Sequence, residues 1–211
     1  MVCCGKIICG GCFREHERQS ESSGSLTCPF SRAEVSSAKE CIKILEKRVA
    51  ANDSENMYQL GRKYLNGDHE LDLKKDEFKA FKLFHRAAEL GSAQAYFNLG
   101  FTYDKGVGVS KDGTKARQYH ELAAIKRCAI SRLSLGAFEV AAGNADRAIK
   151  HCLIAAEFGV VEAVDFIQIF LISGHATKDQ YAQALRLYQA YLDEVKSDQR
   201  GKAAAHSDRS I

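Results

Sequence analysis

The sequence predicts an all-α protein, an α-solenoid of about four antiparallel helix pairs preceded by a small cysteine-rich segment. Three observations carry this prediction. The 211 residues include one proline, a residue that helix interiors exclude because it lacks a backbone N–H. Apolar residues recur at three- and four-residue intervals over most of the chain. Short motifs also recur at fixed spacing, which is typical of stacked repeats.

The recurring motifs are a Leu-Gly pair, a basic residue followed by alanine, and a double alanine. They stand at Leu60-Gly61, Leu99-Gly100 and Leu135-Gly136, at Lys79-Ala80, Lys115-Ala116 and Arg147-Ala148, and at Ala87-Ala88, Ala123-Ala124 and Ala155-Ala156. The spacing from the second motif to the third is constant, whereas the spacing from the first to the second varies. Packed helices fix their own spacing and loops tolerate length changes, so each copy is predicted to be two helices with a variable loop.

The predicted order is a connecting helix, three repeats, a degenerate unit and a tail. Ile42, Leu45 and Val49 share one face of the connecting helix. Residues 93–124 are the best-preserved copy and are expected to form two helices that lie against each other. The predicted segments are 1–35 (cysteine-rich), 36–51 (connecting helix), 52–91, 92–126 and 127–159 (repeats), 160–197 (degenerate capping repeat) and 198–211 (flexible tail).

Glycine inside a helix costs about 1 kcal/mol relative to alanine, so the helical glycines need a reason. Gly61, Gly100 and Gly136 are predicted to lie where a partner helix approaches closely.

The predicted helix ends follow their usual residue types. Gly91 and Gly159 follow double alanines, where a helix ends in a left-handed residue, while Arg127 at the matching position predicts a different end. Thr177 and Gln180 form a predicted capping box. Side chains suited to the start of second helices stand at Asp76, Asp112 and Asn144.

These motifs resemble the Sel-like repeat family, an α-solenoid relative of tetratricopeptide repeats, over about residues 54–195. The second unit carries the resemblance nearly throughout, at Ala95, Leu99, Gly100, Tyr103, Gly106, Gly108, Val109, Asp112, Lys115, Ala116, Tyr119 (or His120), Ala123 and Ala124. The resemblance implies a right-handed superhelix that acts as a non-enzymatic scaffold or adaptor and binds other proteins on its concave face. On the first helices of the units, the candidate contact positions are Arg62, Asn98, Thr102 and Ser134.

The cysteines near the start form a second motif, Cys4-x4-Cys9-x2-Cys12 followed by Cys28-Pro29. Zinc takes four thiolate or imidazole ligands, and Cys-x2-Cys pairs supply two of them. The spacing resembles the later two thirds of a RING-type zinc finger, with Arg32 at the position that contacts the conjugating-enzyme–ubiquitin thioester in active members. The possible zinc ligands are Cys4, Cys9, Cys12 and Cys28, with Cys3 and His16 as further candidates.

The cysteine segment also departs from the RING pattern. The first Cys-x2-Cys pair would precede Cys3, and Ser31 stands at the eighth ligand position. Two alternatives therefore stay open, a segment that binds zinc and a remnant that binds none. A chain that joins a RING finger to Sel-like repeats is similar to proteins of diatoms and related algae. The alternative function is then a truncated or decayed RING-type ubiquitin ligase that recruits substrate through its repeats and engages a ubiquitin-conjugating enzyme.

Several function classes receive no support from composition. The net charge of +3 is too small to indicate nucleic-acid binding, and no apolar run reaches the length of a membrane helix or forms a signal peptide. Cys41, Cys128 and Cys152 are scattered as small hydrophobes, which favours a reducing compartment, the cytoplasm or nucleus. No catalytic constellation is predicted. The recurring histidines, His85, His120 and His151, are interpreted as packing or solvated residues rather than metal or acid–base groups.

Overall fold

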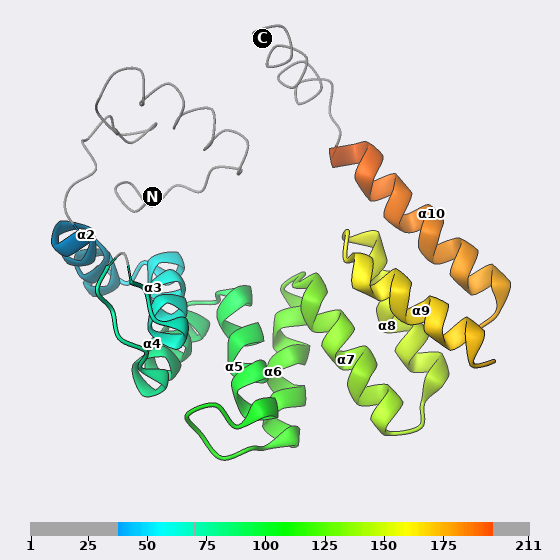
Figure 1. Cartoon of the computed structure of the whole chain (residues 1–211), viewed down its shortest axis with the longest axis horizontal. Coiled ribbons are helices and arrows are strands. Elements are labelled where there is room, and N and C mark those ends of the chain that lie inside the picture. Colours follow the sequence, from blue (N-terminus) through cyan, green and yellow to red (C-terminus); the bar gives the residue numbers. More distant parts are fainter. Residues whose placement is uncertain (1–37, 70, 196–211) are drawn as a thin grey trace, which may run out of the picture. The chain divides into compact units, whose positions relative to one another are not determined.

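The computed structural model describes residues 38–69 and 71–195 (Figure 1), and the part it describes contains nine helices and no β-strand. This confirms the predicted all-α class. The helices are α2 (Ala38–Ala50), α3 (Ser54–Asn66), α4 (Glu77–Glu89), α5 (Ala93–Lys105), α6 (Gly113–Ile125), α7 (Ala129–Ala141), α8 (Ala145–Glu157), α9 (Val161–Ile172) and α10 (Lys178–Val195). Every described helix falls short of the combined length and apolarity that a membrane-spanning helix requires.

The chain divides into two compact units, with the boundary between Asp112 and Gly113. In the first unit α3 and α4 form a closely packed pair, α2 packs against α3, and α5 packs against α4. Leu45 is buried together with Leu60, and Ile42 and Val49 pack beside them. The predicted apolar face of the connecting helix is therefore confirmed.

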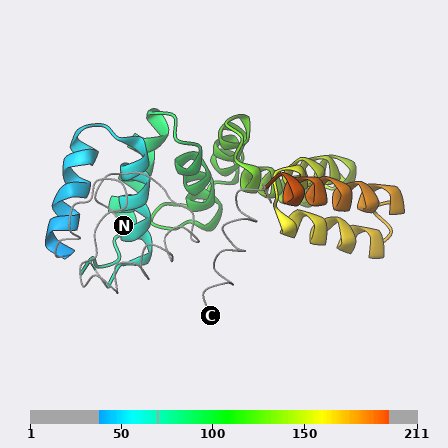
Figure 2. The ribbon, with the colours of Figure 1, turned by 90° about the horizontal axis from the view of Figure 1, so that it is seen from above.

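The second unit contains α6 to α10. Helices α7 and α8 form its tightest pair, α6 packs against α7, and α9 and α10 pack against α8 and against each other (Figures 1 and 2). The buried residues of its core are Ile149, Cys152, Ala155, Ala156, Val160, Ala163, Val164, Ile167 and Ala184. Since the unit boundary falls between α5 and α6, the expected packing of those two helices stays a prediction.

Two of the helical glycines lie where the prediction placed close contacts. A Cβ atom at Gly61 would lie 2.7 Å from the ring of Phe84, which is fully buried on α4. A Cβ atom at Gly136 would lie 3.2 Å from Sγ of Cys152 on α8. A side chain at either position would therefore displace its neighbour, and the close approach of the helices explains both glycines.

Left-handed residues follow three of the second helices. Gly91 has φ +89° and Gly159 has φ +83°, as predicted. Arg127 has φ +66°, so the expectation that this helix ends differently is wrong. The amide of Cys128, the next residue, donates to the carbonyl of Ala123 at 3.0 Å, and this turn holds the arginine in a conformation that usually favours glycine.

Side-chain caps begin several helices. Asp76 accepts a hydrogen bond from the backbone N–H of Lys79 at 2.9 Å, and this bond lowers the pKa of the carboxyl group. The predicted capping box is confirmed, because Thr177 Oγ1 accepts from the Gln180 amide at 3.2 Å and Gln180 Oε1 accepts from the Thr177 amide at 2.8 Å. Asn144 lies at the N-cap position of α8, but its side chain does not cap the helix and donates instead to the carboxylate of Glu139.

Candidate functional site

The predicted zinc ligands, Cys3, Cys4, Cys9, Cys12, His16 and Cys28, lie outside the described residues. Between residues 38 and 195, with residue 70 left aside, no group of three or more histidine, cysteine or carboxylate side chains could hold a metal ion. Cys152 is fully buried on α8, and burial raises the pKa of its thiol to about 12. This thiol therefore has the character of a small hydrophobe.

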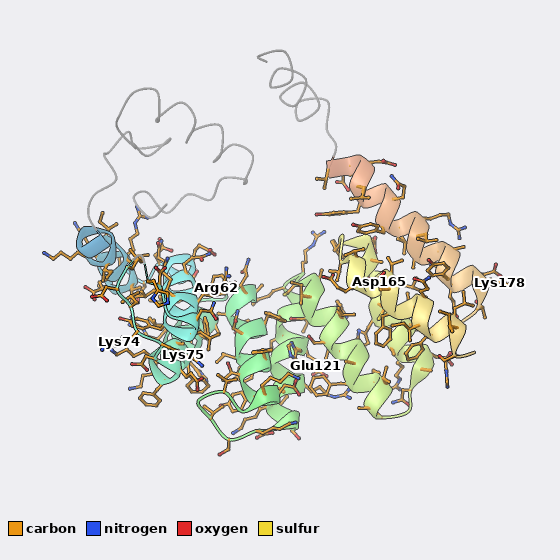
Figure 3. All side chains as sticks on the ribbon, in the orientation of Figure 1. Arg62, Lys74, Lys75, Glu121, Asp165 and Lys178 are labelled. Atoms are coloured by element: carbon orange, nitrogen blue, oxygen red, sulfur yellow. The ribbon has the colours of Figure 1, made fainter. Side chains whose placement is uncertain are left out.

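The predicted partner-binding positions differ in their exposure. Arg62 is exposed on α3, with its guanidinium 5.9 Å from the centre of the Tyr58 ring (Figure 3). Asn98 and Ser134 are half-buried, and each donates a hydrogen bond to the carbonyl one turn earlier in its own helix. Among the described residues, no hydrogen bond or ring contact joins any two of the four predicted positions.

Thr102 is 2% exposed, so the expectation of an exposed contact position there is wrong. It follows Ala95 and Leu99 at intervals of seven and three residues, and both of those residues are buried. Residues at these intervals share one helix face, so Thr102 belongs to the packed face of α5.

A polar cavity of about 270 Å³ lies among α6, α7 and α8 in the second unit, and sequence reasoning missed it. It is lined by Arg117, Glu121, Ala124, Ile125, Arg132, Leu135, Glu139 and His151. One signal could have found it. On α7, Ser131, Leu135 and Glu139 follow one another at four-residue intervals on the buried face, so a carboxylate occupies a core-facing position and needs a partner.

Glu139 is 5% exposed and both of its carboxylate oxygens are engaged. Arg117 donates to Oε1 at 2.7 Å and Asn144 Nδ2 donates to Oε2 at 2.9 Å. The hydrogen bond from Arg117, followed by that from Asn144, lowers the pKa of Glu139. The Arg117 guanidinium also lies 5.6 Å from the centre of the Phe138 ring. These contacts fix one wall of the cavity and explain why Asn144 does not cap α8.

The other titratable side chains of the cavity are Arg132, Glu121 and His151. Neither Arg132 on α7 nor Glu121 on α6 forms an ion pair or hydrogen bond within the described residues. His151 Nδ1 is buried and has no hydrogen-bond partner in the same part of the chain. Burial, followed by the nearby charge of Arg132, lowers the pKa of this histidine. The polar side chains of the lining are two arginines, two glutamates and one histidine.

We expect the Glu139→Gln variant to lose part of the acid sensitivity of the fold. The lowered pKa of Glu139 means that its stabilising contribution is present above the unfolded value of about 4.3 and is lost as pH falls through the folded value. Urea unfolding between pH 3 and pH 6 should therefore show a shallower decline for the variant than for the wild type. Parallel declines would show that the network with Arg117 does not shift this carboxyl group.

The His151→Gln variant should change the pH dependence in a different range. Because the pKa of His151 is lowered in the folded chain, the unfolded chain binds more protons as pH falls below about 6.5, and stability declines there. Urea unfolding between pH 5 and pH 7.5 should give a flatter profile for the variant. An unchanged slope in that range would contradict the burial argument.

The exposed large apolar side chains of the second unit lie on α6, α7, α9 and α10 and in the turn after α8. Ile130 on α7 is 52% exposed, and Ile169 and Ile172 on α9 are 63% and 80% exposed. On α7, Ile130 and Ala137 flank the predicted contact position Ser134 on one helix face, at intervals of four and three residues. This face of α7 and the exposed face of α9 are the uncovered apolar parts of the first helices in this unit.

Comparison with known protein families gives one match. Residues 55–92 and 93–126 match the family model described as Sel1 repeat. No curated protein matches the chain.

The solved structures that resemble the fold include the following two. A Sel1 repeat protein from Oxalobacter formigenes is 27% identical with a TM-score of 0.60, and the match covers 74% of this chain and 65% of that one. The protective antigen c5321 of uropathogenic Escherichia coli strains, which displays an SLR fold, is 20% identical with a TM-score of 0.60, over 94% of this chain and 41% of that one. The chain therefore spans less than two thirds of each relative's length.

Proposed function

We propose that this chain, a Sel1 repeat protein with a helical solenoid fold, is a non-enzymatic scaffold or adaptor that binds other proteins through its first helices. Sel1 repeat proteins generally bind other proteins. The observation that carries the proposal is the exposure of large apolar side chains on the first helices α7 and α9, namely Ile130, Ile169 and Ile172. Large exposed apolar groupings on soluble domains commonly mark interaction sites.

The repeat pattern explains why these side chains are available. The glycines and alanines of the recurring motifs are used inside the helix pairs, as at Gly61, Gly136 and Ala148. The exposed positions of the first helices, among them Ile130, Ile169 and Ile172, are not used in this packing. Fully burying an isoleucine side chain contributes about 1.5–3 kcal/mol, so three of them supply a substantial apolar term for association.

The test combines capture with a surface variant. The immobilised full chain is used to capture proteins from lysate, and an identified partner is then purified and titrated against the wild type and an Ile130→Ser/Ile172→Ser variant. We expect the double variant to weaken binding by about tenfold or more, since each truncated anchor removes apolar contact.

Phe78→Ser is the matched control, because Phe78 is 59% exposed on the second helix α4. The Phe78→Ser variant should bind the identified partner with the same affinity as the wild type. Equal affinity of the double variant and the wild type would contradict the proposal that α7 and α9 present the binding surface.

The cysteine spacing supports a second candidate, a RING-type ubiquitin ligase that binds zinc through some of Cys3, Cys4, Cys9, Cys12, His16 and Cys28 and engages a ubiquitin-conjugating enzyme. Zinc would hold this segment together by tetrahedral ligation. Purified protein should then contain about one zinc ion per chain by colorimetric chelation and should form ubiquitin conjugates with a panel of conjugating enzymes. A metal content near zero together with an absence of conjugates would count against this candidate.

The proposed compartment is the reducing cytoplasm or nucleus. The observation that supports it is that Cys128 and Cys152 are free thiols.

A further inference from the structure

We propose that the exposed face of α9 binds an amphipathic basic helix of a partner protein, an inference that rests on the proposed scaffold function and names the chemistry of the partner. The feature behind it is the α9 sequence VEAVDFIQIFLI, which is apolar on both its inner and outer sides. A helix that is apolar all round is normally buried on every side. Helices α8 and α10 cover only part of α9.

The exposed residues of α9 form one continuous face. They are Val161, Glu162, Asp165, Gln168, Ile169 and Ile172. At 100° per residue these positions span an arc of about 120°, while the buried residues Ala163, Val164 and Ile167 point to the other side. We call this arc the α9 face. Its apolar side chains, Val161, Ile169 and Ile172, are 43%, 63% and 80% exposed.

The charges on the α9 face are all negative. Glu162 and Asp165 are exposed, and within the described residues neither forms an ion pair or a hydrogen bond (Figure 3 labels Asp165). Helix α9 contains no lysine, arginine or histidine. A complementary surface must therefore combine apolar side chains with basic ones.

The shape of the α9 face favours a helix as the occupant. Its apolar and acidic side chains lie along about 18 Å of helix, which corresponds to three turns. The opposite side of α9 already packs against two helices, α8 and α10. A partner helix with apolar residues at three- and four-residue intervals and lysine or arginine beside them matches both features.

The same charges disfavour a second copy of the chain. An α9 face packed on another α9 face would leave Glu162 and Asp165 of both copies without a basic partner on α9, and a parallel arrangement would also bring these carboxylates together. Like charges brought together in this way reduce affinity.

The probes are two synthetic 18-residue amphipathic helices with identical leucine positions. One carries lysine at the polar positions and the other carries glutamate. Each is titrated against the full chain by fluorescence anisotropy at low and at high salt. We expect the lysine peptide to bind about tenfold more tightly or better, and this preference to shrink as salt screens the charges.

Variants of the chain test whether the preference for the lysine peptide arises from the α9 face. Glu162→Gln/Asp165→Gln should abolish the preference for the lysine peptide, and Glu162→Lys/Asp165→Lys should reverse it. Ile169→Ser/Ile172→Ser should weaken binding of the lysine peptide by about tenfold. Asp146→Lys is the matched control, because Asp146 is an exposed carboxylate on α8 in the same unit, lies outside the α9 face and the cavity lining, and should leave the preference unchanged. Circular dichroism confirms that each variant is folded.

Two results would overturn the inference. One is equal binding of the two peptides, or a preference that the charge variants leave intact. The other is concentration-dependent dimerisation of the wild type in analytical ultracentrifugation that Ile169→Ser/Ile172→Ser abolishes, which would assign the α9 face to a second copy. The scaffold proposal has a separate readout, because a captured partner that depends on Ile130 and Ile172 but not on the two carboxylates would contradict only the inference.

Discussion

Replacing Gly159 with alanine is expected to destabilise the second unit by about 2–5 kcal/mol. Two effects add at this position. Gly159 has φ +83°, a conformation that costs a residue with a Cβ atom roughly 1–2 kcal/mol. The added Cβ would also overlap the ring of Tyr191 on α10, which lies directly over this turn. Because α10 packs against α8 and α9, displacing the ring should loosen the last helix.

The chain supplies matched controls for the two effects. Gly143 and Gly174 both have φ +77°, and a Cβ at either position would have no described neighbour within 4 Å. Gly143→Ala and Gly174→Ala should therefore show only the conformational cost of about 1–2 kcal/mol. Urea unfolding followed by circular dichroism measures all three variants, and limited proteolysis should release α10 earlier in Gly159→Ala alone. Equal losses for the three variants would show that Tyr191 moves aside at no cost.

Truncating Phe84 to alanine should cost the first unit about 3–5 kcal/mol. Phe84 is fully buried on α4, and its ring lies against Gly61 and 6.2 Å from the ring centre of Tyr58 on α3. Removal of the ring leaves a cavity between these two helices. Phe78→Ala on the same helix is the control, because Phe78 is 59% exposed and its truncation should cost less than about 1 kcal/mol.

A double-mutant cycle sharpens this prediction. In the wild type Gly61→Ala should destabilise, since the new Cβ would lie 2.7 Å from the Phe84 ring. In the Phe84→Ala background the same change should stabilise, because the methyl group enters the cavity and alanine favours the helix by about 1 kcal/mol. Urea unfolding of the four proteins measures the coupling. The same sign in both backgrounds would contradict the proposed contact.

Much of the fold could be predicted because each repeat marker has a local physical reason. Glycines such as Gly61 and Gly136 identified close helix contacts, and Thr177 with Gln180 identified the start of α10. The capping box depends on residues that are near each other in the sequence, and the glycine contacts depend on the fixed spacing of the repeat motifs. Arg127 was misjudged because residue preference alone suggested a different turn, whereas the backbone hydrogen bonds of the turn override that preference.

The candidate site could not be predicted to the same extent. The cavity depends on Arg117, Glu139 and His151, which come from three helices, and no single helical period brings them together. Thr102 was expected to be an exposed position of its helix, although its spacing from Ala95 and Leu99 puts it on the buried face. The charge pattern of the α9 face is visible in the sequence, but its exposure becomes evident only when α8 and α10 are seen to cover the opposite side.

The buried thiol of Cys152 can be used to measure local opening of the second unit through its rate of alkylation. Its side chain is buried beside Gly136 in the core of the second unit, and its raised pKa keeps it protonated, so an alkylating reagent can modify it only after the helices packed around it separate. The rate of alkylation at Cys152 is measured by peptide mass spectrometry. This rate reports how often the helices around Cys152 separate under native conditions. A ligand that holds these helices together would lower the rate of alkylation at Cys152.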